Sequence, residues 1–90
     1  MSEPKPSSSI NVTYYVALPF VWADDGVAAG EGIECTTSSS AVMAAAAVSR
    51  KEGCAGALAF SRSGDPATGN FENAVLIKAF GEVPSDLSGL

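Results

Sequence analysis

Along residues 10–22, large apolar side chains recur at every second position. The alternating positions are Val12, Tyr14, Val16, Leu18, Phe20 and Trp22. A period of two is that of a β-strand, and the β-branched and aromatic residues of this stretch favour the same structure. Pro19 cannot donate a hydrogen bond to a neighbouring strand, so we expect a sheet edge or a bend at that position.

The pattern then changes to a continuous apolar run at residues 41–48, which has high helix propensity. The Thr and Ser residues at 36–40 precede this run and are candidate N-caps. After it, the basic pair at 50–51 suits the C-terminal end of the helix dipole, and Gly53 suits a left-handed position beyond the helix. Together these features predict a helix over residues 39–52.

The predicted helix has no polar side chain on any face between Ala41 and Val48. A helix that is apolar all round is usually buried or partnered. Alanine tolerates exposure, however, so the same run also fits a helix with one side in water. The sequence leaves both interpretations open.

Two further strands are predicted at residues 54–63 and 71–80, and the sequence DPATGN lies between them. Asp is preferred at the start of such a turn, Pro fits its second position, and Gly accepts a left-handed conformation. A four-residue connection, 66–69, would place Asp65 opposite Asn70 and close a hairpin.

Extending this register along both strands places large apolar residues together on one face, and we assign that face to the helix. A shift by one residue would exchange the two faces, so the register is a sharp prediction. The predicted pairs are Arg62 with Asn73, Phe60 with Val75, Leu58 with Ile77, and Gly56 with Ala79.

These elements predict an α+β fold of two layers, a three- to four-stranded, mostly antiparallel sheet with one helix packed on one face, in the order β-(β)-α-β-β. Residues 23–32 are predicted to be a loop, and residues 32–37 either a short strand or an extended lead into the helix. A single domain is expected over residues 10–83. A flexible tail at 1–9 would precede it, and a loose tail at 84–90 would follow it.

The 90-residue chain is 47% hydrophobic and 17% charged, with a net charge of −5. Scattered basic residues in an acidic chain argue against a nucleic-acid surface. No run approaches the roughly 18 apolar residues of a membrane span, and the N-terminus has Pro, Ser and charge where an export signal has apolar residues. We expect a cytoplasmic protein with no nucleic-acid or membrane partner, in which Cys35 and Cys54 are reduced.

The sequence contains no His. This absence excludes Ser-His-Asp and Cys-His nucleophile systems within one chain. Two cysteines without His cannot build a structural zinc site unaided, and no calcium-binding spacing such as DxDxDG is present. We therefore expect no catalytic residues, no metal and no cofactor, and a protein that is not an enzyme.

The segment SRSGDPATG is the main candidate binding site. Turn geometry accounts for its GDPATG part without a ligand. Ser61, Arg62 and Ser63, together with Asp65, could bind an anion, whereas a purely structural Arg62 would cap the sheet edge with its guanidinium in water. The Thr/Ser run at 36–40 is a second anion candidate, although N-capping needs only one of its hydroxyls.

The stretches YYVALPFV, GEGIEC and AFSRSGDPATG resemble a family of short bacterial proteins of uncharacterised function. The resemblance covers most of residues 14–87, and AFSRSGDPATG is its most specific segment. It implies a freestanding small domain and brings no assigned activity or catalytic residues.

Few charges on a small domain leave much of its surface apolar, and an exposed apolar patch usually marks an interaction site. The half-apolar back of the sheet and the Ala-rich helix are both candidate surfaces for self-association. We expect a protein that acts through association, as a homodimer. The alternative is a small-ligand or anion-binding domain that uses the Ser61–Asp65 segment.

Overall fold

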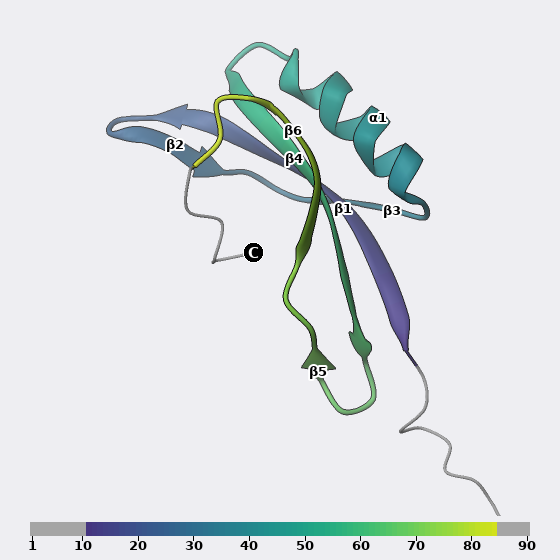
Figure 1. The fold of residues 1–90 in the computed structure, drawn as a ribbon. Coiled ribbons are helices and arrows are strands. Elements are labelled where there is room, and N and C mark those ends of the chain that lie inside the picture. The colour runs from purple at the N-terminus through teal and green to yellow at the C-terminus, as the bar shows by residue number, and fades with distance from the viewer. Residues whose placement is uncertain (1–10, 85–90) are drawn as a thin grey trace, which may run out of the picture.

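The computed structural model describes residues 11–84, so the predicted tail at 1–9 and residues 85–90 lie outside the described part of the chain. Residues 11–84 form six strands and one helix, and the helix lies along one side of a curled sheet (Figure 1). A mostly antiparallel sheet with one helix is thereby confirmed, whereas the predicted number of strands, three to four, is wrong, because the sheet contains six. The elements are β1 (Val12–Ala23), β2 (Gly26–Ala29), β3 (Ile33–Cys35), α1 (Ser38–Ser49), β4 (Cys54–Asp65), β5 (Asn70–Phe71) and β6 (Val75–Gly81).

Strands β1 and β4 form the centre of the sheet and pair antiparallel along most of their length. Strands β2 and β3 pair with successive parts of β1, while β5 and β6 pair with successive parts of β4, all antiparallel. The sheet is therefore four strand positions wide, and each edge position is shared by two short strands. Helix α1 carries the chain from β3 at one edge to the central β4 and crosses β1 on the way.

The hairpin between β1 and β2 was not predicted. The composition of residues 23–32 indicates a loop, but Asp24 and Asp25 form a two-residue turn between the paired residues Ala23 and Gly26. Gly, Ala and Asp are depleted in strands, so the sequence does not reveal β2, which forms because β1 offers it a long partner. The alternative of a short strand within residues 32–37 is confirmed as β3.

Pro19 lies where the pairing of β1 with its edge neighbours is interrupted. The carbonyl of Pro19 accepts the N–H of Gly30 at 2.8 Å, so this side of Pro19 faces the edge strands. Proline has no N–H and therefore cannot donate a hydrogen bond back to the edge strand. The pairing of β1 with the edge strands stops at Ala29 and resumes at Ile33. The missing N–H of Pro19 therefore separates β2 from β3, and the chain of the edge strands leaves the ladder opposite Pro19 of β1.

Thr37 caps the N-terminus of α1, as the Thr/Ser run predicts. The N–H of Ser40 donates to Thr37 Oγ1 at 3.0 Å, and the N–H of Thr37 donates to Ser40 Oγ at 3.1 Å. At the other end, α1 stops at Ser49 rather than at residue 52. The next residues form a turn in which Gly53, with φ of +87°, redirects the chain into β4.

The turn between β4 and β5 is built as predicted. Asp65 pairs with Asn70, and Asp65 Oδ1 accepts the N–H of Ala67 at 2.9 Å. Gly69 has φ of +78°, in the left-handed region that its position in the turn requires.

Beyond this turn the predicted register is wrong. Residues 72–74 leave the ladder, and a second irregularity lies between Ala59 and Phe60 on β4. The pairs therefore differ from the predicted register by one position and then by two, and Arg62 and Asn73 do not pair. The observed pairs are Phe60 with Leu76, Leu58 with Ala79, and Gly56 with Gly81, in place of Val75, Ile77 and Ala79.

Helix α1 also packs on the opposite face from the one predicted. Five alanines with no exposed surface join the helix to the sheet: Ala41 and Ala45 of α1, and Ala17, Ala57 and Ala59 of β1 and β4. Leu58 and Phe60 alternate with the alanines of β4 and lie on the other face. Small side chains allow the helix to approach the sheet closely, whereas Leu and Phe would hold it away.

The two interpretations of the apolar helix can now be distinguished within one chain. Met43 is 72% exposed and Ala47 is also exposed, while Ala41 and Ala45 are fully buried. One side of α1 therefore faces solvent, as expected of an Ala-rich helix that tolerates water.

The alanine contact predicts a clear difference between two substitutions on α1. Ala45→Leu inserts a larger side chain into the helix–sheet contact and should lower the free energy of unfolding by about 1–3 kcal/mol. Ala47→Leu makes the same change on the exposed side and should alter it by no more than about 0.5 kcal/mol. Chemical denaturation of both variants measures the difference, and equal stabilities would contradict the assignment of the packed face.

Candidate functional site

The sheet face opposite α1 carries the larger apolar side chains. We call it the helix-free face, defined by Tyr14, Val16, Leu18, Phe20, Leu58, Phe60 and Leu76. Leu58 is fully buried within the single chain, and Phe20 and Phe60 nearly so, whereas Leu76 remains 46% exposed. The curled sheet thus shelters the middle of this face and leaves part of its apolar surface accessible.

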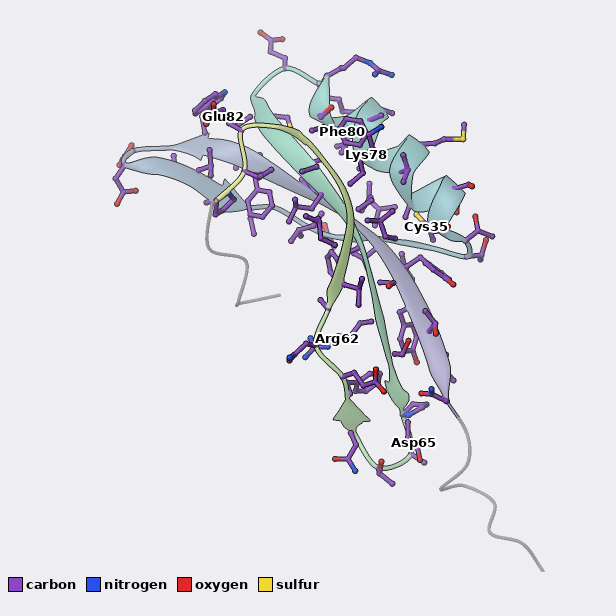
Figure 2. The ribbon with its side chains drawn as sticks, viewed as in Figure 1. Cys35, Arg62, Asp65, Lys78, Phe80 and Glu82 are labelled. Atoms are coloured by element: carbon purple, nitrogen blue, oxygen red, sulfur yellow. The ribbon has the colours of Figure 1, made fainter. Side chains whose placement is uncertain are left out.

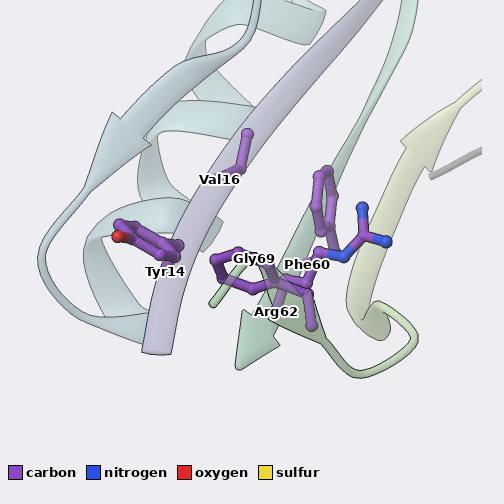
Figure 3. Close-up of a pocket in the computed structure, with 6 residues that line it drawn as sticks. Tyr14, Val16, Phe60, Arg62 and Gly69 are labelled. Carbon is purple, nitrogen blue, oxygen red and sulfur yellow. The ribbon is translucent and has the colours of Figure 1, made fainter. Parts of the chain in front are cut away.

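An open pocket of about 530 Å³ lies on this face, at the end near the β4–β5 turn (Figure 3). We call it the Arg62 pocket; it is lined by Tyr14, Val16, Phe60, Arg62, Gly69 and Phe71. Its lining combines three aromatic rings and one cation, a mixture typical of sites for small organic molecules.

Gly64 allows the aromatic wall of the pocket to form. The rings of Tyr14 and Phe71 lie with centroids 5.9 Å apart at 45°, within the range of favourable aromatic pairs. A Cβ on Gly64 would collide with the backbone oxygen of Asn70 and would lie only 2.6 Å from Cγ of Phe71. The bare backbone of Gly64 therefore lets the Phe71 ring lie against β4 and reach Tyr14 on β1.

Arg62 is half-buried at the rim of the pocket, beside Phe60 (Figure 3). Its Nε donates to the backbone carbonyl of Glu72 at 3.1 Å, which fixes the plane of the guanidinium. Within residues 11–84, its two terminal nitrogens make no hydrogen bond or salt bridge. Arg62 therefore offers an oriented pair of donors next to an apolar surface.

The structure does not bring the four predicted site residues together. Ser61 and Ser63 alternate with Arg62 along β4 and lie on the helix side of the sheet, where Ser63 Oγ is 2.8 Å from Thr13 Oγ1. Asp65 lies farther along the hairpin (Figure 2), and its carboxylate holds the turn through Ala67. Of the four, only Arg62 lines the pocket.

The aromatic members of the pocket were missed by sequence reasoning, although two signals point to them. Phe60 shares a face with Arg62 because it precedes Arg62 by two strand positions. Phe71 comes directly after the turn and pairs with Gly64, where the absence of a side chain leaves room for a ring. Tyr14 belongs to the alternating pattern of β1, and only the pairing of β1 with β4 brings it next to Arg62.

The other polar candidates are engaged in local structure. At the helix N-terminus, Thr37 and Ser40 bond to each other and to the backbone in a capping box. Cys35 and Cys54 are half-buried free thiols. The thiol of Cys54 lies 3.3 Å from the carbonyl oxygen of Phe20 and 3.1 Å from that of Gly56, so its one proton is shared between these two acceptors.

Comparisons with family models, with curated proteins and with solved structures found no match to this chain. The resemblance to a family of short bacterial proteins therefore stays a prediction. In the described part of the chain, no three His, Cys, Asp or Glu side chains gather as metal ligands. The helix at Ser38–Ser49 is too short to cross a membrane, and residues 11–84 contain no other helix.

The contact between Gly64 and Phe71 predicts a coupled effect of two substitutions. Gly64→Ala should displace the Phe71 ring, destabilise the protein by about 1–3 kcal/mol and weaken the Tyr14–Phe71 ring contacts seen by NMR. In a Phe71→Ala background the same change should cost less, because the collision with the ring is gone, although the collision with the Asn70 carbonyl oxygen remains. The same cost in both backgrounds would show that the Phe71 ring does not rest on Gly64.

Proposed function

We propose that the protein is a non-catalytic cytoplasmic domain that acts as a homodimer, joined through the helix-free face. The observation that carries this proposal is the position of α1. The helix covers the alanine face, while the larger apolar side chains lie on the opposite face, where Leu76 is 46% exposed although Leu58, Phe20 and Phe60 are buried. A sheet with apolar side chains on both faces normally has a packed layer on each side, so a second sheet is a natural cover for this one.

The dimensions of the face set an upper limit on the size of the dimer contact. The central strands have 12 residues each, which gives roughly 40 Å of strand, and four strand positions span roughly 19 Å. Their product is roughly 760 Å². A stable interface takes about 800 Å² of accessible surface from each partner. Because Leu58, Phe20 and Phe60 are already buried within one chain, a partner would have to cover the exposed surroundings of this face as well.

The charge distribution supports a second copy of the same chain as the partner. The chain carries a net charge of −5, so two copies repel each other through most of their surfaces. On the paired strands of the helix-free face, the charged side chains are Arg62 on β4 and Glu34, which pairs with Val16. These two charges cancel, so this face can meet its own copy without the repulsion of the remaining surface.

The proposal is tested with Leu76→Glu in analytical ultracentrifugation. Leu76 is 46% exposed in the single chain, so the substitution should leave the fold intact. In a symmetric dimer it places two carboxylates in an apolar contact, and we expect the dimer dissociation constant to rise by about 100-fold or more. The wild-type chain should sediment as a dimer and the variant as a monomer at the same concentration.

Met43→Glu is the matched control, because it introduces the same charge at a more exposed apolar position on the outer side of α1. This variant should remain dimeric. A wild-type chain that is monomeric at every concentration would overturn the proposal. Dissociation by Met43→Glu with no effect of Leu76→Glu would overturn the assignment of the face and point to the helix.

A further inference from the structure

We propose that the Arg62 pocket binds a small, flat, apolar molecule that carries one carboxylate. In this arrangement the carboxylate contacts the guanidinium of Arg62, and the flat body lies against the aromatic wall. All residues that line the pocket belong to one chain. Because the pocket lies at the β4–β5 end of the helix-free face, it can bind a ligand in the homodimer only where the dimer contact leaves this end uncovered.

The shape of the pocket determines the body of the ligand. Its volume of about 530 Å³ is within the range of roughly 300–1,000 Å³ for small-molecule sites. Tyr14 and Phe71 form one aromatic wall, and Phe60, only 8% exposed, provides a fixed apolar surface beside Arg62. Rigid rings favour a flat ligand that can stack or meet them edge-on.

The orientation of Arg62 determines the head group. Its Nε is held by the carbonyl of Glu72 at 3.1 Å, so the guanidinium plane is set before a ligand arrives. The terminal nitrogens present planar donors, which match the two oxygens of a carboxylate. A half-buried Arg beside an apolar wall binds such an anion more strongly than an exposed Arg, because less water screens the contact.

The charge of the surroundings limits the ligand to a single negative charge. Arg62 is the one cation among the residues that line the pocket. Lys78 pairs with Ala59 on the helix side of the sheet, and its Nζ lies 5.7 Å from the centre of the Phe80 ring, where Figure 2 shows both beside α1. Glu72 adjoins Phe71 in sequence, so a doubly charged phosphate would meet one cation and an acidic surrounding.

The test is an amide NMR titration of the wild-type protein with 2-naphthoate, 2-naphthamide and inorganic phosphate. We expect 2-naphthoate to give saturable shifts around Tyr14, Phe60, Arg62 and Phe71, with a dissociation constant of roughly 1 mM or tighter. The neutral 2-naphthamide should bind about tenfold more weakly because it loses the charged contact. Phosphate should leave these amides unshifted.

Arg62→Gln should weaken 2-naphthoate binding about tenfold and remove the preference for 2-naphthoate over 2-naphthamide. Lys78→Gln, on the other face of the sheet, should change neither the affinity for 2-naphthoate nor this preference. Unaltered helix amide shifts establish that each variant is folded. Saturation by phosphate, or 2-naphthoate binding that is insensitive to Arg62→Gln, would overturn the proposal. Repeating the titration on the wild-type protein across a dilution series separates the site from the dimer. Binding retained by the diluted, monomeric chain supports a site within one chain, and binding lost on dilution overturns it.

Discussion

Five buried alanines form the centre of the contact between α1 and the sheet, and larger side chains such as Val48, Ile77 and Phe80 pack around them. This contact determines which face of β1 and β4 points toward the helix. Because a strand alternates its side chains, the burial of Ala57 and Ala59 under the helix sends Leu58 and Phe60 to the opposite face. The same alternation continues to Arg62, which therefore lies with Phe60 and away from Ser61 and Ser63. The composition of the pocket follows from where the alanines lie.

The local signals in the sequence were reliable where short-range chemistry determines the structure. The alternation of β1, the Thr37 cap and the turn from Asp65 to Asn70 each depend on a few neighbouring residues, and each formed as predicted. The register of β4 with β6 depends instead on residues 72–74, whose departure from the ladder has no distinct sequence signal. On hydrophobicity alone, Leu58 and Phe60 were predicted to contact the helix. The helix instead contacts Ala57 and Ala59, because small side chains let it lie closer to the sheet.

In the candidate site, too, the part that depends on neighbouring residues was predicted, and the part that depends on strand pairing was not. Arg62 was singled out because the turn does not explain it, and it is the residue of that segment that lines the pocket. Its companions Ser61 and Ser63 were grouped with it by sequence proximity, which on a strand places neighbours on opposite faces. Tyr14 lies 48 residues before Arg62 in the chain and becomes its neighbour through strand pairing alone.

The interruptions of the two sheet edges also bear on how copies of this protein can join. Between β2 and β3 the ladder is broken opposite Pro19, and between β5 and β6 it is broken at residues 72–74. A long, regular edge would let chains add strand to strand without end, which is the geometry of fibrous aggregates. The edge strands β2, β3 and β5 are short, and the seven-residue β6 is irregular opposite Ala59 and Phe60. The irregular edges therefore act against open-ended polymers and favour a closed pair with a defined number of copies.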